Sequence, residues 1–132
     1  MEATIEVLSS VLKIDYNNLK PLHILNRISK LKKLYWFKNL SEKTLELIAS
    51  KLKKKKYESG EIIVEEGAEA DSFFLISKGR VRISVKGKTL RDLDSGNCFG
   101  ENALLTNERR TASVTAIDNV ICYELRKNLI LY

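Results

Sequence analysis

The segment Phe99–Val114, with the sequence FGENALLTNERRTASV, holds the residues of this chain best suited to binding chemistry. Arg110 can give two parallel hydrogen bonds to phosphate oxygens. A short helix starting at Gly100 would offer backbone N–H groups and the positive end of its dipole to an anion. Glu101 only accepts hydrogen bonds when ionised, so it suits sugar hydroxyls rather than the anion. The segment therefore predicts a sugar-phosphate site, which indicates a nucleotide.

Residues for catalysis are scarce. His23 is the single histidine, and it falls in a predicted helix, where a structural role is more typical than a general base. Cys98 and Cys122 lie in strand-like surroundings without a CxxC pair or a neighbouring histidine, which argues against a metal site. The chain has no phosphate-loop, dinucleotide-fingerprint or kinase motif. We predict a non-catalytic chain with no metal and no cofactor.

Length and composition narrow the class of protein. The 132 residues suit one domain, and no run of about 18 uncharged apolar residues is present to span a membrane. The N-terminus lacks the basic start and apolar core of a signal peptide. Two cysteines without a secretion signal indicate free thiols in a reducing compartment. We therefore expect a cytoplasmic location.

The two parts of the chain differ in charge and in pattern. Residues 1–56 carry 13 basic and 5 acidic groups, a net charge of +8, whereas residues 57–132 carry 10 and 12, a net charge of −2. Apolar spacing of the helical type predicts helices in the first part, on three sets of residues. These sets are Ile5, Leu8, Val11 and Leu12; Leu22, Leu25, Ile28, Leu31 and Leu34; and Leu45, Ile48, Ala49 and Leu52.

The third predicted helix has a clear start and a basic end. Ser41 is the expected N-cap, with Leu40 and Leu45 as a hydrophobic staple. The run 51–56, KLKKKK, is interpreted as a solvated helix end whose cations complement the helix dipole. Binding of nucleic acid or acidic lipid is the alternative function for this run. Tyr35, Trp36 and Phe37 form an apolar turn between helices, typical of packing between helices and barrel.

From residue 57 onward, short β-rich runs alternate with turns that contain glycine. This pattern predicts a small, mainly antiparallel β-roll or jelly-roll barrel, of the α+β class once the N-terminal helices are included. The predicted strands are Ile62–Val64, Phe73–Ser77, Val81–Val85, Thr89–Leu93, Ala112–Ile117 and Val120–Tyr123. We expect a helical segment at 1–56, the roll at 57–124 with its site at 99–114, and the start of a C-terminal helix at 125–132.

The same residues resemble a known family. FGENALLTNERRTASVTA is similar to the phosphate-binding cassette of cyclic nucleotide-binding domains, which runs FGE-x-AL, a variable loop, and R-[AT]-A-[ST]-V. Upstream, GEII at 60–63, EG at 66–67 and DSFFLISKG at 71–79 resemble the turns and the strand of that family. The resemblance covers roughly residues 28–128.

The resemblance implies a role for each matching position. Arg110 would pair with the cyclic phosphate, together with backbone amides at Ala103 and Thr111. Glu101 and the Gly100 backbone would hold the ribose 2′-hydroxyl. Asp71 would hydrogen-bond to Arg110 and orient it. The predicted ligand-binding set is Gly100, Glu101, Asn102, Ala103, Arg110, Thr111 and Arg91, with Asp71 behind it.

The resemblance implies that two of these residues contact the base of the nucleotide. Thr111 and Arg91 match positions at which cGMP-dependent protein kinases contact guanine: the threonine its 2-amino group, the arginine its O6 and N7. A hydroxyl hydrogen bond adds about 0.5–1.5 kcal/mol, and a bidentate arginine about 1–3 kcal/mol of discrimination. The pair therefore favours cGMP as the ligand, with cAMP as the alternative.

The resemblance also implies a context, and the chain departs from the family pattern at several positions. Asn102 stands where an apolar or charged residue is common. Arg109 stands where many members carry proline, and because the chain stops at Tyr132 we expect the helix that caps the base to be truncated. We predict a regulatory cyclic-nucleotide sensor that acts on an attached effector, a protein kinase domain. The alternatives are a cAMP-preferring regulatory domain, a structural domain that binds no nucleotide, and a DNA-binding regulator using the basic half.

Overall fold

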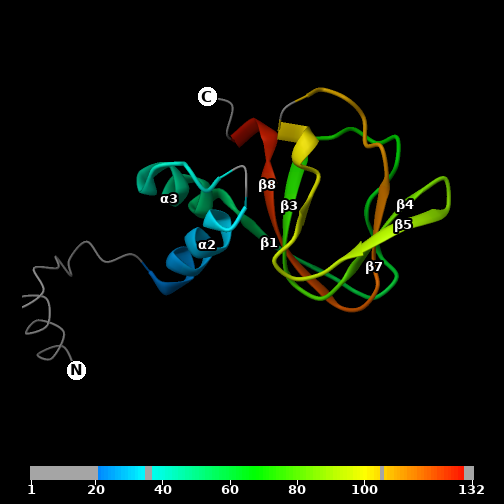
Figure 1. The fold of residues 1–132 in the computed structure, drawn as a ribbon, viewed down its shortest axis with the longest axis horizontal. Coiled ribbons are helices and arrows are strands. Elements are labelled where there is room, and N and C mark those ends of the chain that lie inside the picture. The colour runs from blue at the N-terminus through cyan, green and yellow to red at the C-terminus, as the bar shows by residue number, and fades with distance from the viewer. Residues whose placement is uncertain (1–20, 35–36, 105, 130–132) are drawn as a thin grey trace, which may run out of the picture.

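The computed structural model describes residues 21–34, 37–104 and 106–129, in which two helices pack against a roll of eight strands (Figure 1). The helices are α2 (Leu22–Lys32) and α3 (Glu42–Lys51). Two single 3₁₀ turns follow later in the chain, η2 (Glu101–Leu104) and η3 (Lys127–Leu129). The predicted helix around Ile5–Leu12, and Tyr35 and Trp36 of the apolar turn, lie outside the described residues. None of the described helices has the length and apolar character needed to cross a bilayer.

The strands form two four-stranded sheets in which every pairing is antiparallel. The first sheet has the order β1-β8-β3-β6, with β1 at Lys53–Tyr57, β8 at Val120–Arg126, β3 at Ser72–Lys78 and β6 at Cys98–Phe99. The second has the order β2-β7-β4-β5, with β2 at Ile62–Val64, β7 at Ser113–Ala116, β4 at Val81–Val85 and β5 at Lys88–Leu93. The predicted antiparallel β-roll is confirmed.

Helix α3 begins where its capping residue predicts. The Ser41 Oγ accepts a hydrogen bond from the Thr44 backbone N–H at 3.2 Å, which satisfies one of the amides left unpaired at a helix start. Leu45, Ile48 and Ala49 then lie on one buried face, as helical spacing requires. The cap and the apolar stripe together place α3 against α2 and the roll.

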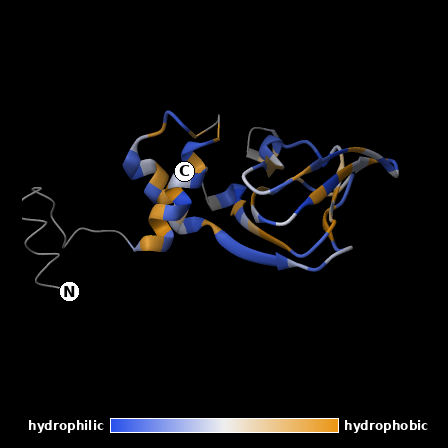
Figure 2. Cartoon of the chain, turned by 60° about the horizontal axis from the view of Figure 1, so that its bottom comes forward, coloured by the Kyte–Doolittle hydropathy of each residue, from blue (hydrophilic) through white to orange (hydrophobic). Residues whose placement is uncertain are grey.

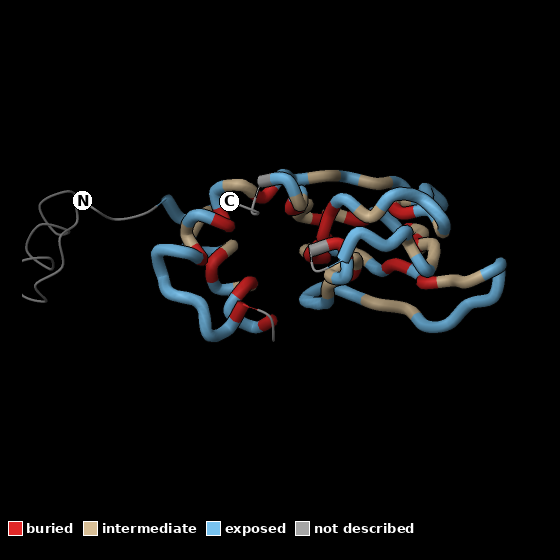
Figure 3. The backbone as a smooth tube through the Cα atoms, turned by 90° about the horizontal axis from the view of Figure 1, so that it is seen from above, coloured by how far each residue is buried: buried red, intermediate tan, exposed pale blue. Residues whose placement is uncertain are grey.

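Strand β3 connects two hydrophobic clusters, because successive side chains of a strand point to opposite faces. Phe73 and Leu75 pack with the helices, whereas Phe74 and Ile76 fill the interior of the roll. The Phe73 ring also meets Phe37 edge to face, with 5.6 Å between centroids. Figure 3 shows the buried positions gathered inside the helical layer and inside the roll, with the turns exposed. The helices and the roll therefore share one strand.

Three details of the predicted elements are corrected. The lysine run is not a helix end: α3 ends at Lys51, and Lys53–Tyr57 form strand β1. Pairing with β8 gives this polar segment backbone partners, which local sequence pattern does not reveal. Strand β6 was not predicted either, since two residues carry no periodicity. At the other end, β8 continues through Arg126, so the residues from Leu125 begin in a strand and not in a helix.

We expect Ser41→Ala to lower the free energy of unfolding by about 1 kcal/mol, because the first turn of α3 loses its side-chain cap. Urea denaturation followed by circular dichroism measures the change. Ser41→Asp is the matched control, since an aspartate accepts the same hydrogen bond and should keep the wild-type midpoint. Equal losses in both variants would show that the Ser41 cap does not stabilise the helix.

Candidate functional site

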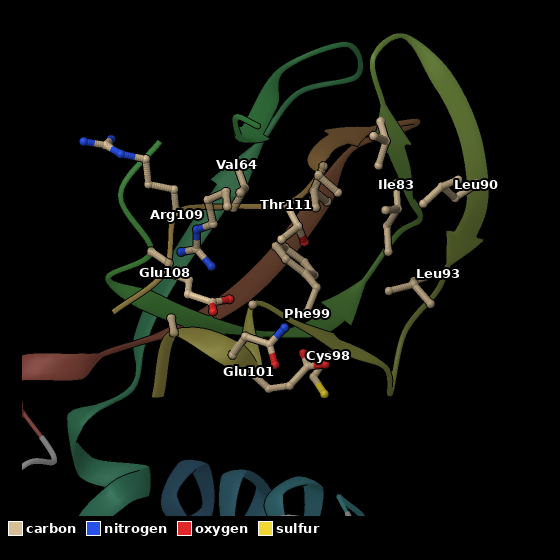
Figure 4. A pocket seen from close by; sticks show the side chains of 18 of the residues that line it. Val64, Ile83, Leu90, Leu93, Cys98, Phe99, Glu101, Glu108, Arg109 and Thr111 are labelled. Atoms are coloured by element: carbon tan, nitrogen blue, oxygen red, sulfur yellow. The ribbon is translucent and has the colours of Figure 1, made fainter. Parts of the chain in front are cut away.

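A cavity of about 360 Å³ opens between the segment 99–114, called the cassette below, and the β4–β5 hairpin (Figure 4). Its walls are apolar on the side of the roll, where the ring of Phe99 stacks on Phe74 at 4.9 Å between centroids. Polar groups of the cassette line the opposite side. The structure brings together on this cavity all seven predicted ligand-binding residues, namely Gly100, Glu101, Asn102, Ala103, Arg110, Thr111 and Arg91.

Arg110 and Gly100 are in direct contact. The Arg110 Nη2 donates a hydrogen bond to the Ser72 carbonyl oxygen at 2.8 Å, which holds the guanidinium across the start of η2. Gly100 has a φ of +79°, and a Cβ there would lie 2.7 Å from Arg110 Nη1 and 2.9 Å from the Ser72 carbonyl oxygen. Both the backbone angle and the space therefore require glycine.

Asp71 contributes less to the orientation of Arg110 than the resemblance implies. Its Oδ1 lies 3.8 Å from Arg110 Nη2, an ion pair without the predicted hydrogen bond, and its side chain is 65% exposed. The orienting hydrogen bond goes instead to the backbone of Ser72, which side-chain patterns cannot reveal. Burial lowers the pKa of the Arg110 guanidinium, whereas the charges of Asp71 and Glu124 raise it. The arginine is thus a largely desolvated cation with a backbone anchor.

The short turn η2 places Glu101 and Ala103 on the cavity. The Ala103 N–H donates to the Gly100 carbonyl oxygen at 3.0 Å and so closes the turn. An anion bound by this amide must share or replace that hydrogen bond. Figure 4 shows Glu101 and Cys98 at one end of the cavity, with Thr111 across Phe99 from them. The acceptor, the amide and the guanidinium are therefore grouped as a sugar phosphate requires.

The cysteines do not add chemistry to the cavity. Cys98 lines it, but burial and the charge of Glu101 raise the pKa of its thiol to about 11. Burial alone raises the pKa of Cys122 to about 12. Both are free thiols that stay protonated near neutral pH, and a thiol is a poor nucleophile and metal ligand. The described part of the chain contains no cluster of three potential metal-binding side chains.

Arg91 reaches the cavity through strand register. It pairs with Ile83, and residues directly opposite one another in an antiparallel pair lie on the same face of the sheet. Ile83 belongs to the core of the roll, so Arg91 lies on the inner face. The neighbouring pair, Arg82 and Asp92, forms an ion pair on the outer face, with Nε to Oδ1 at 2.9 Å.

Lys127 is a residue that the sequence reasoning missed. Its Nζ donates to the Thr106 carbonyl oxygen at 2.7 Å and to the Asn107 Oδ1 at 2.6 Å. Its backbone N–H donates to the Asp71 carbonyl oxygen at 2.8 Å. Lys127 thereby connects the cassette loop to the segment that follows β8. Arg109, where many family members carry proline, lines the cavity while its Nη1 donates to the Gly67 carbonyl oxygen.

Residues 54–131 match the family model described as "Cyclic nucleotide-binding domain". This match covers more than half of the chain. The chain belongs to the cyclic nucleotide-binding domain family. The matched residues include η2, Arg110 and strands β2 to β8.

Two relatives of similar sequence are named as cGMP-dependent protein kinases. A cGMP-dependent protein kinase of Plasmodium berghei is 37% identical over 119 residues, covering 89% of this chain and 13% of the relative. A second relative is the cGMP-dependent protein kinase of Drosophila melanogaster, isozyme 2, forms cD5/T2. It is 41% identical over 100 residues, which cover 70% of this chain and 11% of the relative. In structure, the cAMP-bound regulatory domain of Toxoplasma gondii PKA aligns with a TM-score of 0.78 at 25% identity, covering 84% of this chain and 44% of that one. This chain therefore spans a small part of its curated relatives.

We expect Gly100→Ala to weaken the binding of both cAMP and cGMP by about tenfold or more, because its Cβ displaces the Arg110 guanidinium. Gly96→Ala is the matched control: it has a similar φ of +91°, but its Cβ meets nothing within 4 Å. Both variants should lose about 1–2 kcal/mol of stability from the positive φ, measured by denaturation. Isothermal titration calorimetry separates them, and equal affinities in the two variants would contradict the contact between Gly100 and Arg110.

Proposed function

We propose that this domain is a regulatory sensor that prefers cGMP and controls an attached protein kinase domain. The observation that carries the proposal is the convergence of all seven predicted ligand-binding residues on one cavity. Arg110 serves the cyclic phosphate, and Glu101 serves the ribose 2′-hydroxyl. The apolar wall formed by Val64, Ile83 and the Phe99 ring receives the base and excludes water from the phosphate contact.

The preference for cGMP rests on Thr111 and Arg91. Both line the cavity: Thr111 lies two residues before β7, and Arg91 lies on the inner face of β5. A threonine hydroxyl next to the phosphate-binding arginine suits the guanine 2-amino group, which adenine lacks. An arginine suits the paired acceptors O6 and N7 of guanine, whereas adenine presents a donor at the corresponding edge. A cAMP-preferring sensor is the second candidate, favoured by the likeness to the cAMP-bound Toxoplasma domain.

The proposed switch links the cassette to the chain after β8. When the phosphate draws Arg110 and the η2 amides together, the loop at Thr106 and Asn107 moves with them. Lys127 holds that loop through two hydrogen bonds, so its segment follows. The nucleotide shifts this equilibrium only to the extent that it binds the two arrangements with different affinity. The helices respond through β3, whose Phe73 and Leu75 pack against them.

The kinase context and the location belong to the same proposal. The relatives named as cGMP-dependent protein kinases are much longer than this chain, so a kinase domain on the same polypeptide is the expected effector. A reducing, cytoplasmic location is consistent with those relatives and with two free thiols. The chain itself would contribute ligand binding and not catalysis.

We expect Arg110→Ala to cost about 2–5 kcal/mol of binding free energy for either nucleotide, because the phosphate loses a desolvated charged partner. Calorimetry with cAMP and cGMP measures this loss, and thermal unfolding checks that the variant is folded. The adjacent Arg109→Ala is the matched control. Because the Arg109 side chain is hydrogen-bonded to the Gly67 carbonyl oxygen, this variant should lose less than about tenfold in nucleotide affinity. Unchanged affinity in Arg110→Ala would overturn the phosphate assignment.

We expect Thr111→Ala and Arg91→Ala to weaken cGMP binding selectively, by up to about tenfold for the threonine and about 5- to 150-fold for the arginine. Affinity for cAMP should stay nearly constant in both. Side-by-side titration of the two nucleotides gives the selectivity ratio. Arg82→Ala, on the outer face of the neighbouring strand, should change neither affinity. If wild type binds cAMP more tightly, or if both ligands weaken equally, the guanine assignment is wrong.

A further inference from the structure

Strand β1 is an open sheet edge made almost entirely of lysine. It is the outermost strand of the first sheet, and its sequence is KKKKY. Figure 2 shows it as a continuous hydrophilic band along the outside of the fold. Lys53, Lys54 and Lys56 are exposed, and Lys55 is half-buried. An edge strand directs half of its backbone N–H and C=O groups away from its neighbour, so this edge retains pairing capacity.

The charges of this edge are not neutralised within the described part of the chain. Ion pairs in this part include those of Lys32, Arg80, Arg82 and Arg110, and none of the four β1 lysines has a carboxylate partner within 4.0 Å. The residue opposite Lys53 is Glu124, and those opposite the other three lysines are uncharged. Four adjacent cations repel one another, so the edge favours an acidic partner.

The directions of the lysine side chains along β1 determine what shape of partner can contact all of them. Neighbouring side chains alternate between the two faces of a sheet, so Lys54 and Lys56 lie on one face and Lys53 and Lys55 on the other. Tyr57, on the face of Lys55, packs against the core of the roll, while Tyr123, opposite Lys54, packs against the helical cluster. The lysines therefore flank the open backbone edge on both sides and do not form one flat basic plane.

This arrangement suits an extended peptide better than a flat anionic surface. An added strand forms backbone hydrogen bonds with the edge and carries its own side chains alternately to both faces, next to both lysine pairs. A membrane approaching either face meets only two of the four lysines. A second copy of β1 is disfavoured, because two rows of lysines would repel. We propose that β1 is a docking edge for an extended acidic segment of a partner protein, which joins the first sheet as an additional strand.

The test uses the chain as it stands and a fluorescent, N-acetylated peptide with four consecutive glutamates at its centre, which carry carboxylates to both faces of the added strand. We expect saturable binding that weakens as salt rises, with new protection from hydrogen exchange at residues 53–57. The same peptide with N-methylated backbone amides keeps its carboxylates but loses its donors, and it should not bind. Equal binding of both peptides would overturn strand addition in favour of charge attraction alone.

Paired substitutions locate the site. Two double variants each remove one lysine pair, and each should weaken peptide binding about two- to tenfold. They are Lys54→Gln with Lys56→Gln, and Lys53→Gln with Lys55→Gln. Lys86→Gln with Lys88→Gln, at the tip of the β4–β5 hairpin, removes the same charge far from this edge in the fold and should leave binding intact. An equal effect of all three pairs would refute the docking edge. All variants should keep wild-type affinity for cyclic nucleotide, so the result is independent of the proposed sensor function.

Two further probes distinguish other anionic partners. Vesicles of phosphatidylserine and phosphatidylcholine, and a short DNA duplex, are titrated under the same salt conditions. We expect both to bind more weakly than the acidic peptide. Tighter binding of the vesicles or of the duplex, lost in the β1 variants, would assign the edge to lipid or nucleic acid and overturn the peptide proposal.

Discussion

The buried guanidinium of Arg110 sets the conditions that the rest of the binding site meets. Its side chain is only 8% exposed, so it needs a hydrogen-bond acceptor inside the protein, and the Ser72 carbonyl supplies one at 2.8 Å. That contact brings the end of the cassette against the first residue of β3. Gly100 lies between them, where any side chain would collide with both. The start of η2, and with it the positions of Glu101 and Ala103, follows from this single contact.

The same strand carries the site and its connection to the helices. Ser72 begins β3, and the residues after it alternate between the interior of the roll and the helical cluster. A displacement of the Arg110 anchor therefore acts on a strand that both layers share. Lys127 makes a second connection, from the cassette loop to the segment after β8. A binding event of a few hydrogen bonds is thus linked to two parts of the fold that lie outside the cavity.

The net charge of the chain does not indicate where an anion would bind. The net charge of +6 comes from the helical part and β1, whereas the proposed anion site lies in the part with a net charge of −2. The site has a desolvated arginine and oriented backbone amides, and these interact with an anion more strongly than exposed lysines can. The lysines of β1 face solvent at the sheet edge, where they suit contact with another molecule. Arg110 and the β1 lysines, the two proposed uses of positive charge, lie in different parts of the fold.

The sequence by itself determined six of the eight strands, the Ser41 cap and the identity of the cassette, because each depends on neighbouring residues. The resemblance of the sequence to a known family also named the seven residues that line the cavity. Only the tertiary structure decided that Lys53–Lys56 form a strand, since the backbone of β1 pairs with β8, more than sixty residues later. It likewise gave Arg110 its anchor on Ser72 and not on Asp71, and Lys127 its place on the cassette loop. Backbone carbonyls carry no side-chain signal, so contacts to them become visible only when distant segments have folded together.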